Sequence, residues 1–214
     1  MERGNNYLLQ AEQAKHTFLT YDQEALIRKF RLEADGVWLY PRMLGAQYRL
    51  NRETGNLQRL SDGQWADANT HSEVMTLLDL LCDSREDRCL SGSWKTMQAF
   101  GNQVHSGLLE ETGNPVAAFY AAHLPAFKDA CRALGGIPVP MGDVGFGIEL
   151  FDGLRIAPVL WLADEDFPAS LRFFWDSNAL MYLRYETMYF AVNLLEERIR
   201  EAMAQAENTR AIDR

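Results

Sequence analysis

The stretch VGFGIELFDGLRIAPVLWLADEDFPASLRFFW, residues 144–175, decides the fold class. Three β-rich segments lie in it: Val144 to Phe151, Leu154 to Ala163 and Ser170 to Trp175. Asp152-Gly153 is a strong signal for a two-residue hairpin turn, and DEDFP (164–168) supplies the second turn. The stretch therefore predicts a three-strand antiparallel meander.

The middle segment of this meander, APVLWLA (157–163), is almost wholly apolar. A strand that faces water on one side alternates between apolar and polar residues, so this strand is expected to be covered on both faces. Helices are expected to supply at least one of the two covers.

Helical patterns surround the meander. Thr70 and Glu73 form a capping box, and the apolar spacing that follows predicts an amphipathic helix. Pro125 is expected to divide the helix that starts at Asn114-Pro115 from a second one that ends at Gly135-Gly136. Further helices are predicted over Asn5 to Leu19, Tyr21 to Phe30 with Asp22 as N-cap, and Thr187 to about Glu207.

A small β-hairpin is predicted before the capping box. Its strands are Gln47 to Leu50 and Leu57 to Leu60, joined by the turn Asn51 to Asn56, and Val37 to Tyr40 is a further strand. The chain is expected to form a single α+β domain over residues 1–214, with an antiparallel sheet covered by several helices. Within it, residues 1–68 form a helical N-terminus with the small hairpin, and residues 70–206 form the core.

The composition of the chain argues against several classes of function. The chain has 214 residues and a formal net charge of −9, and such a surface repels phosphate backbones, so nucleic acid is not expected as a partner. No apolar run approaches the ~20 residues of a membrane helix, and the first residues do not form a secretory signal. A cytoplasmic location without membrane contact is expected. Oligomeric state cannot be read from the sequence.

Cysteine and histidine give no metal signature. The three cysteines, Cys82, Cys89 and Cys131, are widely spaced, and unreactive thiols are favoured over a reactive cysteine. The four histidines lack metal-ligand spacing. His71, in the capping box, is expected to be exposed, and His105 is a candidate acid or base.

The second half of the chain resembles a known family. The matching pieces are a helix ending in LGG (134–136), GD (142–143) before a Phe-bearing strand, P-x-x-L-W-x-x-D-x-x-F-P (158–168), F-x-D-S (174–177) and a close around Tyr182 to Glu186. This order resembles the DUF3786 family of bacterial and archaeal proteins, a domain of unknown function. The resemblance covers roughly Glu73 to Arg198.

The resemblance implies an anaerobic setting. Members of the family occur mostly in anaerobes, and some carry a cysteine-rich iron–sulfur domain, which implies redox or corrinoid-related metabolism. This chain has no cysteine cluster, so the resemblance implies that electron transfer would need a partner protein. The family brings no established reaction.

One acidic and aromatic span, Trp161 to Glu186, carries the candidate site. Asp164 to Asp166 are expected to form a solvated turn, with a hard-cation site as the alternative. The hairpin geometry places Asp176 at the opposite end, where it is either a cap, a buried partner of Arg155, or part of a pocket. The predicted ligand-binding residues are Asp176, Tyr182, Glu186, Trp175 and Arg155.

Three functions stay open at this point. The favoured one is a non-catalytic domain that binds a small molecule or cofactor in anaerobic metabolism. The second is an enzyme of unknown reaction that uses Asp176, Tyr182 and Glu186, although Glu186 also suits a helix N-terminus for electrostatic reasons alone. The third is a protein-interaction module with an acidic surface. No cofactor can be named.

Overall fold

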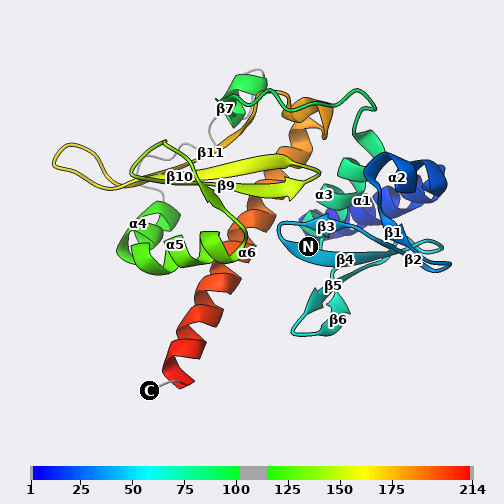
Figure 1. The fold of residues 1–214 in the computed structure, drawn as a ribbon, viewed down its shortest axis with the longest axis horizontal. Helices are drawn as coiled ribbons and strands as arrows, with labels where there is room; N and C mark the ends of the chain where they lie inside the picture. The colour runs from blue at the N-terminus through cyan, green and yellow to red at the C-terminus, as the bar shows by residue number, and fades with distance from the viewer. Residues whose placement is uncertain (1, 102–114, 213–214) are drawn as a thin grey trace. The chain divides into compact units, whose positions relative to one another are not determined.

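The computed structural model describes residues 2–101 and 115–212. They group into two compact units. Unit 1 comprises Met1–Cys89 and Asn178–Leu194, and unit 2 comprises Leu90–Ser177 and Leu195–Arg214. Each unit contains an antiparallel sheet and helices, so the fold is α+β, as the sequence predicts (Figure 1).

Unit 1 is built on a small sheet with the order β1-β2-β4-β5-β6, and β3 pairs with β4. The β4–β5 hairpin is the one predicted from the sequence, with Leu50 opposite Leu57. The strands are β1 (Glu33–Ala34), β2 (Trp38–Tyr40), β3 (Arg42–Met43), β4 (Ala46–Asn51), β5 (Leu57–Ser61) and β6 (Gln64–Asp67).

The helices of unit 1 are α1 (Glu2–Leu19), α2 (Gln23–Phe30), α3 (His71–Asp83) and the start of α6 (Tyr185–Ile212). Two of them, α2 and α3, begin at the predicted caps, whereas α1 and α6 begin a few residues before the predicted starts at Asn5 and Thr187. The Asp22 side chain accepts a hydrogen bond from the amide of Ala25, and the Thr70 hydroxyl accepts one from the amide of Glu73. Glu73 returns the interaction by accepting from the Thr70 hydroxyl at 2.9 Å.

Unit 2 is built on the predicted meander. Its sheet has the order β7-β11-β10-β9-β8, and its strands are β7 (Trp94–Thr96), β8 (Ile137–Pro138), β9 (Val144–Phe151), β10 (Leu154–Trp161) and β11 (Ser170–Asp176). Asp152 and Gly153 both have positive φ, as a two-residue hairpin turn requires. Residues 156–160 of β10 are all buried, which confirms that this strand is covered on both faces.

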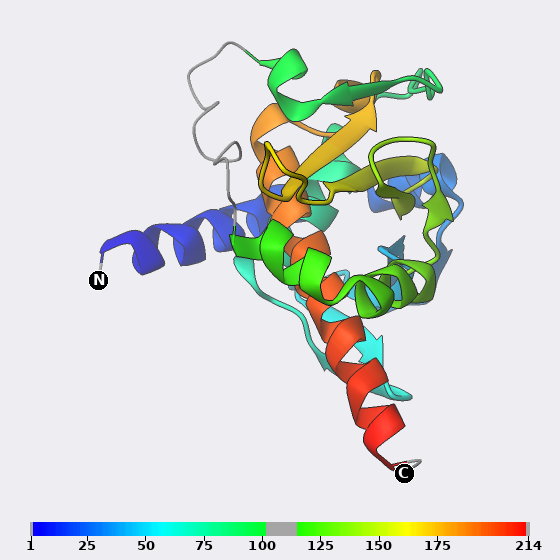
Figure 2. The ribbon, with the colours of Figure 1, turned by 90° about the vertical axis from the view of Figure 1, so that its left-hand side faces the viewer.

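Helices cover the sheet of unit 2. These are α4 (Pro115–Ala122), α5 (Leu124–Ala133) and the end of α6. Two short 3-10 turns complete the described elements: η1 (Met97–Phe100) belongs to unit 2, and η3 (Ala179–Met181) belongs to unit 1. Both views show α4 and α5, in green, on the same side of the yellow meander strands (Figures 1 and 2). The break between α4 and α5 lies at His123, next to the predicted Pro125. No helix in the described ranges is long and apolar enough to cross a membrane.

Candidate functional site

A pocket of about 350 Å³ lies within unit 1. Its walls come from α1, α3 and the chain around the start of α6. Apolar and polar side chains share the lining, as in most small-molecule sites. The lining residues are Gln10, Gln13, Ala14, Thr17, Met75, Leu78, Asp79, Cys82, Asp83, Arg184, Glu186 and Phe190.

Helix α1 supplies one wall of the pocket. One of its faces is buried against the rest of unit 1, and a neighbouring face lines the pocket. Ala11, Lys15 and Phe18 repeat every three or four residues and are buried. The Lys15 ammonium donates to the side chain of Asn56 at 2.9 Å, and a side chain at Gly55 would lie 2.9 Å from the Cβ of Lys15. These contacts fix α1 against the β4–β5 turn and leave its neighbouring face for the pocket.

The two helices α1 and α3 run side by side in the same direction. At one end, His71 of α3 lies 3.0 Å from the side chain of Gln10. At the other end, burial raises the pKa of Tyr21, which follows α1, and the negative charge of Asp83 in α3 adds to this rise. The pocket between them therefore has an amide end near Gln10 and an acidic end near Asp83.

Asp79 is the buried charge-bearing group of this pocket. The residue is only 7% exposed, and one carboxyl oxygen accepts a hydrogen bond from the hydroxyl of Thr187 in α6. Burial, together with the negative charges of Asp83 and Glu186, raises its pKa. A carboxyl group of this kind in a cavity is a common mark of a functional site.

Arg184 and Asp83 neutralise each other at the acidic end. The guanidinium binds both carboxylate oxygens of Asp83, with Nε–Oδ2 at 2.7 Å and Nη2–Oδ1 at 2.9 Å. Such two-point pairing fixes the orientation of the arginine. The hydrogen bond with Asp83 raises the pKa of Arg184, so the guanidinium keeps its charge.

Cys82 lines the same pocket but is not activated as a nucleophile. Burial and the nearby Asp83 and Asp79 raise the pKa of its thiol to about 12. Burial alone raises the pKa of Cys131 to about 12 as well. Both thiols therefore stay protonated at neutral pH, in agreement with the unreactive cysteines expected from the sequence.

The predicted ligand-binding residues fall in both units. Glu186 and Tyr182 belong to unit 1, and Trp175, Asp176 and Arg155 belong to unit 2. Of the five, Glu186 lines the pocket described above. Tyr182 is 3% exposed, and its carbonyl accepts a hydrogen bond from the hydroxyl of Ser84 at 2.8 Å.

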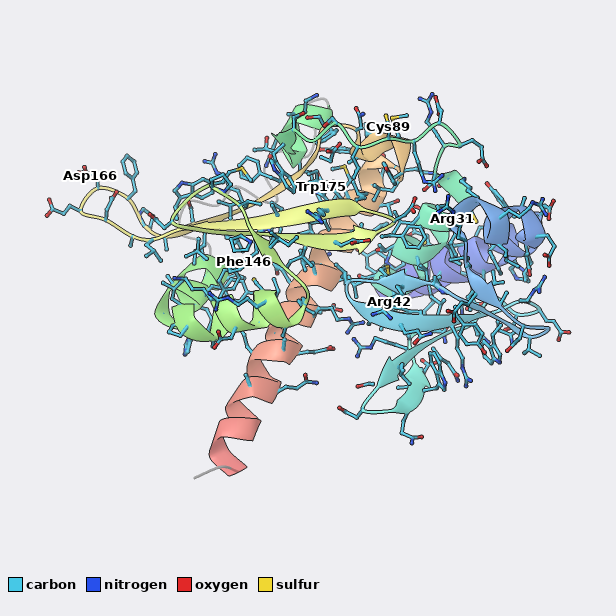
Figure 3. All side chains as sticks on the ribbon, in the orientation of Figure 1. Arg31, Arg42, Cys89, Phe146, Asp166 and Trp175 are labelled. Carbon is cyan, nitrogen blue, oxygen red and sulfur yellow. The ribbon has the colours of Figure 1, made fainter. Side chains whose placement is uncertain are left out.

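Asp176 lies at the end of β11 and holds a neighbouring segment. Its carboxylate accepts hydrogen bonds from the amides of Ser91 and Gly92, both at 2.9 Å, and from the Ser91 hydroxyl at 3.0 Å. Trp175 beside it is fully buried within the sheet (Figure 3). Arg155 lies on β10 opposite Glu149 of β9.

The acidic turn after β10 is the local structure predicted for it. One oxygen of Asp164 accepts hydrogen bonds from the amides of Asp166 and Phe167, at 2.9 and 2.7 Å. Asp166 lies at the exposed tip of this turn (Figure 3). The register from Ile156–Trp175 to Trp161–Ser170 confirms that Asp164 and Asp176 lie at opposite ends of the hairpin.

The histidines show one difference from the sequence-based expectation. His71 is half-buried, because its ring packs against Tyr7 and Phe190 at centroid distances of 4.7 and 4.6 Å. Burial lowers its pKa. The sequence showed only its place in the capping box, and both aromatic partners lie on other helices. His105 lies outside the described residues. Over residues 2–101 and 115–212, no group of three or more metal-ligating side chains could hold a metal ion.

Comparison with known proteins decides the family. The model of the family named "Domain of unknown function (DUF3786)" matches residues 22–198. The chain belongs to the DUF3786 family. No curated protein and no solved structure matches it.

The DUF3786 match extends further back than the resemblance seen in the sequence, which covered roughly Glu73 to Arg198. It ends at the same residue but starts at residue 22, just before α2. The acidic end of the pocket, with Asp79, Asp83, Arg184 and Glu186, lies inside the matched range. Helix α1, with the other wall, lies before it.

Sequence reasoning missed most of this pocket. One signal was available, because Asp79 interrupts the run LLDLL (77–81) in a helix whose apolar stripe had been recognised. An acid within such a run is rarely buried without a reason. The contributions of Gln10, Gln13 and Arg184 carry no local signal, since they depend on how distant segments pack.

Proposed function

We propose that this DUF3786 domain binds a small organic molecule in the pocket of unit 1. The observation that carries the proposal is Asp79, an acidic residue that is 7% exposed and lines a cavity of about 350 Å³. Burying a carboxyl group is costly, and cavities with apolar walls and a few convergent polar groups are the usual form of a ligand site.

The volume indicates the size of the ligand. At about 30 Å³ for each water molecule, a cavity of about 350 Å³ has room for roughly a dozen waters. A ligand with about a dozen non-hydrogen atoms fits this space, and a corrinoid ring with its side arms exceeds it. A role in anaerobic metabolism rests on the family resemblance alone.

The alternative enzyme that uses Asp176, Tyr182 and Glu186 has less support. The carboxylate of Asp176 is engaged by Ser91 and Gly92, and Tyr182 is packed in the interior of unit 1. A binding function in this pocket does not require Asp176 or Tyr182 to act as catalytic groups. Glu186, in contrast, is one of the residues that line the pocket.

Filling the pocket tests the proposal. Ala14→Trp places an indole in the cavity, and His16→Trp is the matched control, because His16 is exposed on α1 and does not line the pocket. A broad panel of metabolite-sized compounds at millimolar concentration is screened by thermal shift. Compounds that bind should raise the Tm of the wild type and of His16→Trp, but not of Ala14→Trp. No shift across the panel, or equal shifts in all three proteins, would overturn the proposal.

A further inference from the structure

The charges that line the pocket of unit 1 are unevenly paired. Arg184 and Asp83 bind each other through two contacts of 2.7 and 2.9 Å. Asp79 and Glu186 form no ion pair within the described residues. Among the lining residues, two carboxyl groups therefore have no cationic partner, whereas the arginine is already paired with a carboxylate.

Asp79 also has hydrogen-bonding capacity to spare. One of its carboxyl oxygens, Oδ2, accepts from the Thr187 hydroxyl, and this is the hydrogen bond that Asp79 makes among the residues that the structure describes. Asp79 lines the cavity, and its small exposed fraction is the part that reaches it. Its second carboxyl oxygen is not among the fully buried atoms without a partner, so a donor on a ligand in the cavity can reach it. A cationic donor would make a charge-assisted hydrogen bond with it.

We propose that the pocket binds a small primary amine as its ammonium ion, with N–H donors directed at Asp79 and Glu186. This inference rests on the function proposed above and names the chemical class of the ligand. An ammonium group brings three donors and one positive charge, which match two carboxylates that lack a cation.

Anionic ligands fit the pocket poorly. The cation in the lining, Arg184, already forms an ion pair with Asp83. A phosphate or carboxylate would face Asp79 and Glu186 without compensation, because like charges that are partly desolvated repel strongly. Neutral alcohols could bond to Asp79 but would leave the negative charge of the pocket unbalanced.

The remaining walls suit a short apolar body on the amine. Ala14, Met75, Leu78 and Phe190 supply apolar surface, and Gln10 and Gln13 lie towards the end opposite Asp83. The ligand that best fits these walls is an alkyl or arylalkyl amine with about a dozen non-hydrogen atoms or fewer, by the volume argument given above.

Binding should also depend on pH in a defined direction. The groups that face Asp79 are Cys82 and Asp83 from its own helix, Tyr21 after α1, Arg184 just before α6, and Glu186 and Thr187 in the first turn of α6. Their effect together with burial is a raised pKa, so an ammonium ion must bind the ionised form against this preference. Affinity should rise with pH through the titration of Asp79 and stay constant until the ammonium ion itself loses its proton at alkaline pH.

The test compares three probes of nearly equal shape by calorimetry: 2-phenylethylamine, 2-phenylethanol and 3-phenylpropionate. The amine is expected to bind at least about tenfold more tightly than the other two, which is the range of one charge-assisted hydrogen bond. Asp79→Asn keeps an acceptor for Thr187, and Glu186→Gln changes an exposed residue, so both variants should fold. Each should weaken amine binding about tenfold.

The matched control is Asp62→Asn, which removes one negative charge from an exposed turn of unit 1 outside the pocket. Asn tolerates the positive φ of this position, and amine affinity should stay within about twofold. Tighter binding of the alcohol or the acid, or full affinity in both pocket variants, would overturn the amine assignment while leaving a binding pocket in place. If Ala14→Trp changes no binding of any probe, the proposed function itself fails.

Discussion

Asp176 accepts hydrogen bonds from both the backbone amide and the hydroxyl of Ser91, across 85 positions of the chain. With the amide of Gly92, these bonds hold the segment that leads into β7. Asp176→Ala removes a buried acceptor from three donors and should lower the free energy of unfolding by about 2 kcal/mol. Urea denaturation of the variant measures the loss.

Asp164→Ala is the comparison for this prediction. Asp164 also accepts two backbone amides, but it lies in an exposed turn where water can replace it. Its loss should cost about 0.5–1 kcal/mol. Equal losses in the two variants would show that Asp176 contributes no more than a solvated turn residue.

Alanine substitutions at two glycines with positive φ should distinguish the cost of backbone strain from the cost of steric overlap. Gly63 has φ +74° and open space around its missing Cβ, whereas a Cβ at Gly142 (φ +60°) would lie 2.9 Å from the carbonyl oxygen of Leu160. Gly63→Ala should cost about 1 kcal/mol, from the left-handed conformation alone. Gly142→Ala should cost about 3 kcal/mol or more, because overlap adds to strain. The order of the two melting temperatures decides this, and a reversed order contradicts it.

Thiol chemistry should distinguish the three cysteines. Cys89 is exposed, Cys131 is buried, and the pKa of Cys131 and of Cys82 is raised to about 12. At pH 8, about one in ten thousand of such thiols is ionised, so iodoacetamide should modify Cys89 first. Peptide mapping by mass spectrometry follows the order, and urea should make all three react. Rapid modification of Cys82 in the folded protein would contradict the burial argument.

The stability contributed by Asp79 should decrease as pH rises. Burial raises its pKa in the folded state above about 3.9, the unfolded value, so the folded protein holds this proton more tightly. Its contribution is complete below pH 3.9 and is lost as pH rises through the raised pKa, by at most about 1.4 kcal/mol per pH unit. Relative to Asp79→Asn, the wild type should therefore lose stability over this window in urea titrations. A difference that grows with pH would show that the carboxylate is stabilised instead.

Helices and turns that are marked by short sequence motifs of their own were predicted correctly. Asp152-Gly153 defined the β9–β10 turn, and Thr70 with Glu73 defined the start of α3, because both act on their own neighbours. The three meander strands were predicted to within two residues at each end. Short strands such as β3 and β6 were missed, since two to four residues carry no periodicity.

Elements that depend on distant partners could not be predicted. β7 is a strand because Trp94 pairs with Asp176, and nothing in its sequence of three residues indicates this. The pocket likewise needs α1 beside α3, and only Asp79 gave a local hint. That residues 1–214 form a single domain stays a prediction.

Helix α1 lies before residue 22, where the family match begins, while the carboxyl groups of the pocket lie after it. The carboxyl groups proposed to bind the amine and the α1 wall of the cavity therefore lie in two separate stretches of the chain. Substitutions at Gln13 or Ala14 can reshape the cavity while Asp79 and Glu186 stay as they are. Under the proposed function, substitutions confined to α1 should change the size of the ligand that fits without altering the carboxyl groups proposed to bind its ammonium group.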